Sequence, residues 1–137
     1  SSELERELDS NGIAYKWIPK LGGRRRPTPD SLNTGWRHPA FRAYADHIAT
    51  DEFAEGLAEL TMLAGGLRTA VMCAEVLWWR CHRRIVSDVL TFIGYEVIHI
   101  RDADHFEIHE IGAPARLADG ELSYADDVQL GLGIEAG

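Results

Sequence analysis

The sequence lacks the features of several common protein classes. It has only two cysteines, Cys73 and Cys81, which are too few for the disulfide framework of a small secreted domain. No stretch has the length and apolar character of a membrane span, and none has the pattern of a signal peptide. Repeats and low-complexity segments are also missing. We therefore expect a cytoplasmic protein that folds as one α/β domain over residues 1–137.

Positive charge is scarce in the last part of the chain. Residues 85–137 carry two arginines against eleven acids, whereas residues 16–84 carry eleven of the fourteen Lys and Arg against seven acids. The net charge of -8 argues against a general nucleic-acid binder. A basic region within an acidic chain instead favours a small anionic ligand, phosphorylated or nucleotide-like. Residues 101–137 form a polar, acidic tail in this interpretation.

Hydrophobic patterning predicts helices and strands that alternate along the chain. One predicted helix ends near Gly12, a second runs through Phe41 and Ile48, a third starts at Thr50, and a fourth runs from about Trp78 to Gly94. The predicted strands are residues 13–18, 69–73 and 95–100. Because the run 69–73 is apolar on both faces, this order favours an α/β fold with a mostly parallel, three-layer-type sheet and flanking helices.

Both cysteines lie in the segment 72–84, where a predicted strand gives way to a predicted helix. Open α/β sheets bind ligands at such junctions. Cys81 is expected early in the helix, where the helix dipole and neighbouring arginines favour a thiolate, so it is a candidate nucleophile or redox centre. The alternative is that Cys81, four residues before Ile85 on the same helix face, is a small buried side chain that packs in the core.

Three more residues of this segment complete the predicted catalytic set. Cys73 is a supporting thiol or a core side chain, and Glu75 is an acid/base or an ion-pair partner that orients arginines. His82 adds positive potential beside Cys81. A zinc ion held by Cys73, Cys81, His82 and a further histidine such as His99 or His109 is conceivable, but the spacing is not a recognised one, and adjacent helical residues such as Cys81 and His82 diverge by about 100°. We therefore expect no metal ion, and we expect no cofactor. His99 is expected to be a core histidine.

A second basic cluster precedes the predicted helices. Two glycines let the backbone approach a ligand, and the following arginines offer forked donors to phosphate, although the lysine and Ser/Thr of a Walker loop are missing. A solvated basic turn is the alternative. Trp36 and Arg37 of the same loop are able to stack on a base or a sugar, and Trp78 and Trp79 could do the same, although tryptophans beside a core strand more often pack. With arginines from elsewhere, the candidate ligand-binding residues are Gly22, Gly23, Arg24, Arg25, Trp36, Arg37, Arg42, Arg80 and Arg83.

Five motifs in order along the chain resemble domain of unknown function family 488. They are Gly12-Ile13-Ala14-Tyr15, residues 21–25, residues 41–45, Cys73-Ala74-Glu75 with Cys81-His82-Arg83, and His109 with residues 120–124. The resemblance implies a bacterial or archaeal cytoplasmic α/β protein with no established activity. It also implies that two strands of the family domain are missing at the front. We therefore expect an N-terminally shortened domain that covers its exposed sheet surface by forming a homodimer or a larger assembly, through a contact built from the N-terminal helix and its adjacent sheet edge or helix face.

Three functions remain open from the sequence. The first is a thiol-containing enzyme that acts on a phosphorylated or nucleotide-like small molecule. The second is a noncatalytic module that binds an anion or a nucleic-acid end, in which the thiols only pack. The third is a shortened interaction protein without retained chemistry.

Overall fold

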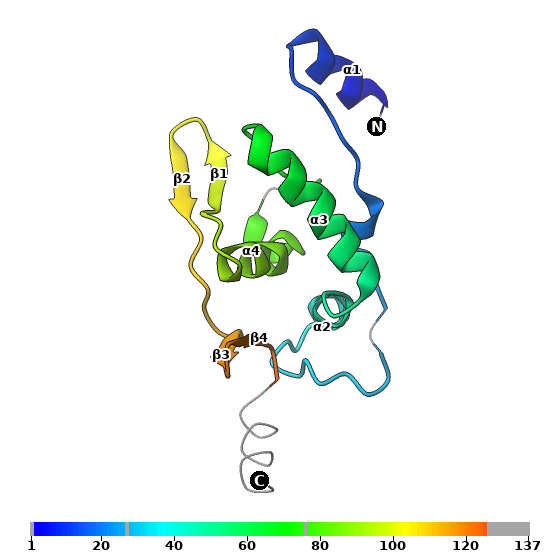
Figure 1. Ribbon diagram of the computed structural model, residues 1–137, viewed down its shortest axis with the longest axis vertical. Coiled ribbons are helices and arrows are strands. Elements are labelled where there is room, and N and C mark those ends of the chain that lie inside the picture. The colour runs from blue at the N-terminus through cyan, green and yellow to red at the C-terminus, as the bar shows by residue number, and fades with distance from the viewer. Residues whose placement is uncertain (1, 27, 76, 126–137) are drawn as a thin grey trace, which may run out of the picture.

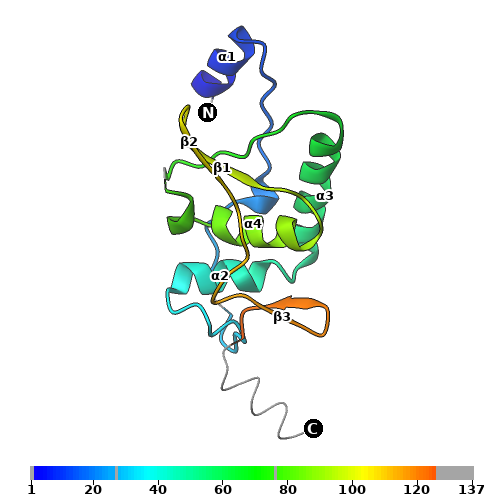
Figure 2. The same cartoon turned by 90° about the vertical axis from the view of Figure 1, so that its left-hand side faces the viewer.

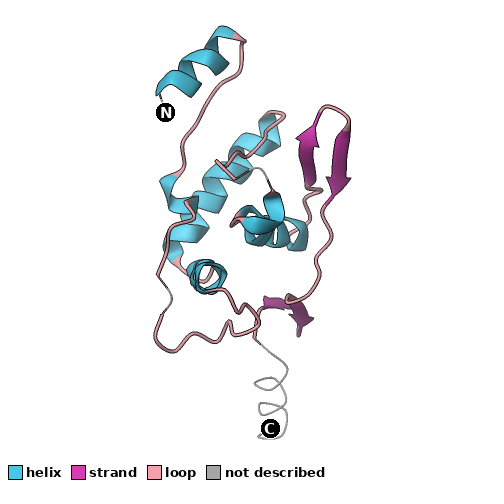
Figure 3. Cartoon of the chain, turned by 180° about the vertical axis from the view of Figure 1, so that it is seen from behind, coloured by secondary structure: helices cyan, strands magenta, loops and turns pink. Residues whose placement is uncertain are grey.

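The computed structural model describes residues 2–26, 28–75 and 77–125 (Figure 1). The helices are α1 (Ser2–Ser10), α2 (Pro39–His47), α3 (Asp51–Gly66) and α4 (Arg83–Phe92), with 3₁₀ turns η1 (Pro19–Leu21) and η2 (Trp78–Arg80). The strands are β1 (Ile98–Asp102), β2 (His105–Ile108), β3 (Arg116–Ala118) and β4 (Glu121–Ser123). Helices dominate, and the strands form two small hairpins (Figure 3).

The predicted helices form, and their starts follow from local capping. Thr50 accepts a hydrogen bond at Oγ1 from the Phe53 amide, at 3.2 Å, and Asp51 and Glu52 occupy the first turn of α3. One start differs from the prediction. The segment from Trp78 forms η2, and α4 begins only at Arg83, so Cys81 precedes the helix instead of lying within it.

The prediction of a mostly parallel, three-layer sheet is wrong, although the mixed α/β class is confirmed. β1 pairs antiparallel with β2, and β3 pairs antiparallel with β4. In the described part of the chain, residues 13–18 and 69–73 form no strand. The reason is that parallel pairing needs a crossover and a neighbouring strand, whereas a hairpin needs only a short turn. Asp119 and Gly120 make such a turn with φ of 53° and 75°.

The core lies among α2, α3 and α4. Its largest fully buried side chains are Tyr44, Phe53, Ile85 and Tyr124. Tyr124 follows β4, so the described part of the predicted tail contributes to the core. The rest of that predicted tail, residues 126–137, lies outside the described residues.

The long loop before α2 is fixed by one carboxylate. Asp46 of α2 accepts hydrogen bonds from Thr28, from Ser31 Oγ at 2.6 Å and from Asn33 Nδ2 at 2.7 Å. Burial acts to raise the pKa of Asp46, but these hydrogen bonds outweigh it and lower the pKa overall. The loop therefore packs on α2 in a defined conformation.

Two parts of the molecule have little cover. α1 has no buried residue and lies away from the other helices (Figures 1 and 2). In the β1–β2 hairpin, Ile98 lies opposite Ile108 and Ile100 lies opposite Phe106, and all four side chains are exposed. None of the helices in the described residues combines the length and apolar composition that a membrane crossing requires.

Candidate functional site

A cleft of about 660 Å³ surrounds the two thiols, and we call it the thiol cleft. It lies between the loop before α2, the loop that carries Cys73, and the segment from η2 to the start of α4. Its lining residues are Gly23, Arg24, His38, Ala40, Phe41, Cys73, Glu75, Trp79, Arg80, Cys81 and His82. All four predicted catalytic residues are therefore in one cleft, with three of the predicted ligand-binding residues.

Arg83 holds the two cysteine-bearing segments together. Its Nε donates to Cys81 Sγ at 2.9 Å, and its backbone amide donates to the same sulfur at 3.3 Å. Its Nη2 donates to the backbone carbonyl of Glu75. These bonds tie the loop at residues 73–75 to the start of α4. Arg83 thus positions the thiols through hydrogen bonds to the protein itself, whereas the sequence analysis assigned it to an anion.

Cys81 is buried, with 9% of its surface exposed, and Cys73 is half-buried. Burial raises the pKa of the Cys81 thiol, and the hydrogen bonds and charge of Arg83 act in the opposite direction. The expectation of an easily ionised Cys81 is therefore wrong for the free chain. The hydrogen bonds and charge of Arg83 offset only part of the desolvation of the thiol.

His82 is fixed by a close backbone approach. A Cβ at Gly23 would stand 2.4 Å from His82 Nδ1, so only glycine lets this loop pack on the imidazole. Burial lowers the pKa of His82, and the positive charges of Arg83 and Arg25 lower it further. The ring is therefore neutral at pH 7, which leaves one nitrogen with a free lone pair.

Cys73, Cys81 and His82 bring their ligand atoms together. The two sulfur atoms and an imidazole nitrogen all lie within 4.8 Å of one another. Cys81 and His82 do not diverge as adjacent residues of a helix would, because neither lies within α4: Cys81 has extended backbone angles, φ −131° and ψ 172°, and His82 is the N-cap residue of α4. We call this group the Cys73–Cys81–His82 cluster.

Charged groups line the cleft around this cluster. Arg24 and Arg80 are exposed, and Glu75 is half-buried with Oε1 accepting from the Leu77 amide at 3.1 Å. One predicted role of Glu75 is to pair with an arginine through its carboxylate. Instead, Arg83 donates a hydrogen bond to the backbone carbonyl of Glu75. The carboxylate itself lies against the cleft, where it can accept a proton.

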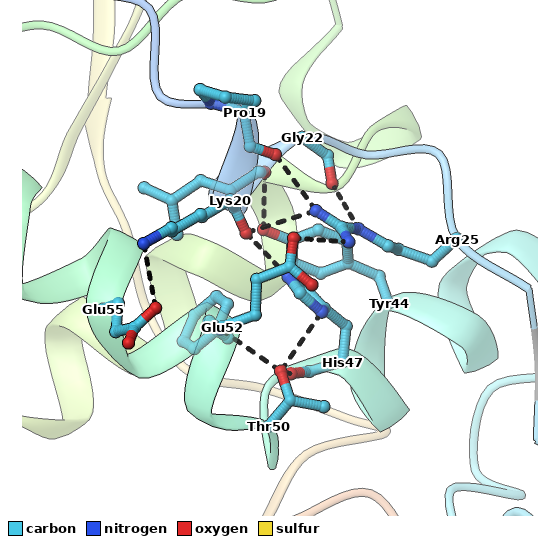
Figure 4. A network of polar contacts seen from close by, with 11 residues as sticks. Pro19, Lys20, Gly22, Arg25, Tyr44, His47, Thr50, Glu52 and Glu55 are labelled. Atoms are coloured by element: carbon cyan, nitrogen blue, oxygen red, sulfur yellow. Dashed lines mark hydrogen bonds and ion pairs between the residues drawn. The ribbon is translucent and has the colours of Figure 1, made fainter.

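Arg25 and Gly22 belong to a separate network (Figure 4). The Arg25 guanidinium donates to the carbonyls of Pro19, Lys20 and Gly22 and to Glu52 Oε1, at 3.0–3.3 Å. Tyr44 and His47 bind the carbonyls of Leu21 and Lys20 from the other side. This network fixes η1 on α2 and α3, so Arg25 acts as a structural clamp.

The remaining predicted ligand-binding residues also lie outside the cleft lining. Trp36 is a core side chain, 5% exposed, and stacks on Phe41 with ring centroids 4.9 Å apart. Arg42 donates from Nε to the Trp36 carbonyl at 3.1 Å, and Arg37 is exposed. Trp36 and Arg42 therefore support the wall of the cleft that Phe41 of α2 forms.

A buried chain of polar side chains was missed by the sequence analysis. Asp88 of α4 accepts from Tyr124 Oη at 2.7 Å and from His109 Nε2 at 2.6 Å, and His99 Nε2 lies 2.7 Å from His109 Nδ1. We call Asp88, His109 and His99 the histidine chain. The available signal was Asp88 itself, because a carboxylate within the apolar stripe of a helix needs buried partners.

The histidine chain and the thiol cleft lie on adjoining structural elements. His99 stacks on Trp78 of η2, with ring centroids 3.7 Å apart, and η2 leads directly into Cys81. A second cavity of about 320 Å³ contacts Asp88 and His109, and Trp79 lines both cavities. Burial, followed by the neighbouring His109, lowers the pKa of His99 to about 4. His99 is therefore a neutral, packed histidine at pH 7.

Comparison with known proteins gives one family. The family model described as "Domain of unknown function DUF488" matches residues 1–90 of the 137 residues. The matched range includes the whole Cys73–Cys81–His82 cluster and confirms the resemblance there, while the motifs at His109 and residues 120–124 lie beyond it. Neither a curated protein nor a solved structure matches the chain.

Proposed function

We propose a function on the premise that this chain belongs to the DUF488 family, whose function is not established. In this proposal the thiol cleft is the active site of an enzyme that acts on a small phosphorylated or nucleotide-like molecule. Cys81 is the central reactive group, with Cys73 and His82 beside it, and Glu75 is the acid/base.

The single observation that carries this proposal is the composition of the thiol cleft. Two thiols and an imidazole lie within 4.8 Å of one another in a cavity that arginines also line. A packing cluster would need no carboxylate and no exposed arginines at its mouth. Reactive side chains beside positive charge are what a site for an anionic substrate requires.

Substrate class follows from the charge and size of the cleft. Arg24 and Arg80 line it and are exposed, so their guanidinium groups can reach a phosphate. Trp79 and Phe41 add aromatic walls for a sugar or a base. A volume of about 660 Å³ lies in the range of small-molecule sites and suits a ligand of nucleotide size.

Isothermal titration with inorganic phosphate and adenosine monophosphate tests the binding part. We expect the double variant Arg24→Ala, Arg80→Ala to weaken binding at least ~10-fold, and added salt to weaken binding to the unmodified chain. Arg6→Ala is the matched control, because Arg6 lies in α1, away from the other helices. Equal affinities of the double variant and the control would overturn the assignment of the anion site.

Catalysis is tested separately with a panel of phosphorylated small molecules followed by mass spectrometry. The proposal predicts that at least one member is converted by the unmodified chain and not by Cys81→Ala. The second candidate, a noncatalytic anion-binding module, is favoured by the burial that raises the pKa of Cys81. It predicts binding without conversion, and a Cys81→Ala variant that retains full affinity.

A further inference from the structure

We propose that the Cys73–Cys81–His82 cluster binds one zinc ion through three protein ligands. The inference deepens the proposed function and rests on it for the substrate, because it supplies the reactive centre of the same cleft. The fourth position of the ion would face the thiol cleft, where an oxygen of the anionic substrate or a water molecule can bind.

The spacing of the three ligand atoms is close to what zinc requires. With Zn–S of about 2.3 Å and Zn–N of about 2.0 Å, ligand atoms in a tetrahedral site stand about 3.3–3.8 Å apart. The three atoms of the cluster already lie within 4.8 Å of one another. Each separation therefore exceeds the tetrahedral range by about 1 Å or less, which is the shortening that closing the site requires.

The donor set selects the metal. Two thiolates and an imidazole are soft and borderline ligands, which suit zinc and leave calcium or magnesium, which prefer oxygen ligands, poorly bound. Three protein ligands with an open fourth position are typical of catalytic zinc sites, whereas structural sites have four. The position of the cluster in the wall of a cavity fits the catalytic type.

The surroundings of the cluster support zinc binding as well. Arg83 donates two hydrogen bonds to Cys81 Sγ, from Nε at 2.9 Å and from its backbone amide at 3.3 Å. Such donors stabilise a metal-bound thiolate and orient it. Gly23 packs on the imidazole and fixes the ring of His82. A pair of packed thiols would not need either arrangement.

Glu75, Arg24 and Arg80 line the cleft that the fourth, open position of the zinc ion would face, and they could take part in its chemistry. Zinc lowers the pKa of a bound water to about 7, and a nearby carboxylate can take its proton. Glu75 lines the cavity beside Cys73, and Arg24 and Arg80 can hold the substrate anion. The cleft would thus contain the parts of a zinc hydrolase.

Zinc titration of the reduced full chain tests this proposal. We expect one zinc per chain, and after cobalt(II) replacement a thiolate-to-cobalt charge-transfer absorption. Cys73→Ser and His82→Gln should each weaken zinc binding on the order of 10- to 100-fold or more. His38→Gln is the matched control, because His38 lines the same cleft but lies outside the cluster. Its zinc affinity should be unchanged.

If a variant fails to fold, alkylation of the unmodified chain gives the answer. Zinc should protect Cys73 and Cys81 together from alkylation, as mapped by mass spectrometry. Stoichiometry well below one zinc per chain, or zinc that leaves both thiols open to alkylation, would overturn the proposal. Phosphate binding that needs Arg24 and Arg80, in a chain that binds no zinc at the cluster, would leave the proposed function standing and overturn the zinc site. Zinc binding without phosphate binding would leave the zinc site standing and overturn the proposed substrate class.

Discussion

At the scale of single residues, Gly23 is the position on which the cluster depends most directly. In Gly23→Ala the new Cβ would stand 2.4 Å from His82 Nδ1, so the imidazole must move. We predict that zinc affinity falls on the order of 10-fold, as for other changes that misplace a ligand. The matched control is Gly65→Ala in α3, where a Cβ meets nothing within 4 Å and stability should stay equal or rise. Equal zinc affinities of the two variants would contradict this role of Gly23.

The second residue-scale prediction concerns Asp88. This carboxylate is 3% exposed and accepts hydrogen bonds from both Tyr124 and His109. Asp88→Ala leaves two buried donors without a partner, so we expect urea denaturation to show a loss of about 3 kcal/mol in the free energy of unfolding. Asp30→Ala, at an exposed position, should change it by less than about 0.5 kcal/mol. A small loss for Asp88→Ala would mean that the histidine chain adds little to stability.

The histidine chain also predicts a pH dependence. His99 has an ordinary pKa of 6.5, lowered to about 4 in the folded chain, chiefly by burial. As the pH falls below 6.5, the unfolded chain therefore binds the proton first, and stability decreases down to about pH 4. Thermal unfolding from pH 7 to pH 4 should show this decrease, and His99→Gln should make it shallower. An identical pH profile for both chains would contradict the burial of a neutral His99.

At the scale of elements, Arg25 holds η1 in place. Its guanidinium donates to three backbone carbonyls and to Glu52 (Figure 4). We predict that Arg25→Ala lowers the free energy of unfolding by about 1–3 kcal/mol, because carbonyls of η1 lose a charged donor. Arg26→Ala, at the exposed next residue, should be within about 0.5 kcal/mol of the unmodified chain. Similar losses for both variants would contradict the clamp.

The elements also show what the sequence can and cannot predict. Local signals located the helices, because a cap such as Thr50 and the apolar stripe of α3 lie within a few residues of each other. Two of the three predicted strands, residues 13–18 and 69–73, do not form, while the third, residues 95–100, overlaps β1 from Ile98. The misplaced strands show that pairing depends on partners that local patterns do not specify. Residues 69–73 have the composition of a buried strand, yet they lie in the loop that carries Cys73.

The candidate site was predicted in composition but not in geometry. Cys73, Glu75, Cys81 and His82, which the sequence crowds into one segment, all line the thiol cleft. The convergence of His82 with the two thiols was rejected, because the predicted helix from Trp78 would have made Cys81 and His82 diverge, whereas the break between η2 and α4 brings them together. Arg25 could not be recognised as a clamp, since its partners in η1 and α3 depend on tertiary packing.

At the scale of the whole molecule, the β1–β2 hairpin presents an uncovered apolar face. Ile100 and Phe106, directly opposite each other, are 68% and 69% exposed. We propose that two copies pair through this face, because the same patch on both chains can form a two-fold contact. Light scattering after gel filtration should give a dimer for the unmodified chain and a monomer for Phe106→Lys. Leu117→Lys in β3 is the control, because Leu117 is 62% exposed, similar to Phe106 at 69%, and it should stay dimeric. A monomeric unmodified chain at micromolar concentration would contradict this pairing.

The central claim is that Cys73, Cys81 and His82 form one metal-binding centre in the thiol cleft. X-ray absorption spectroscopy at the zinc edge of the zinc-loaded chain tests it most directly. The account predicts two sulfur neighbours at about 2.3 Å and nitrogen or oxygen neighbours at about 2.0 Å around the ion. A shell of nitrogen and oxygen alone, without sulfur, would contradict it.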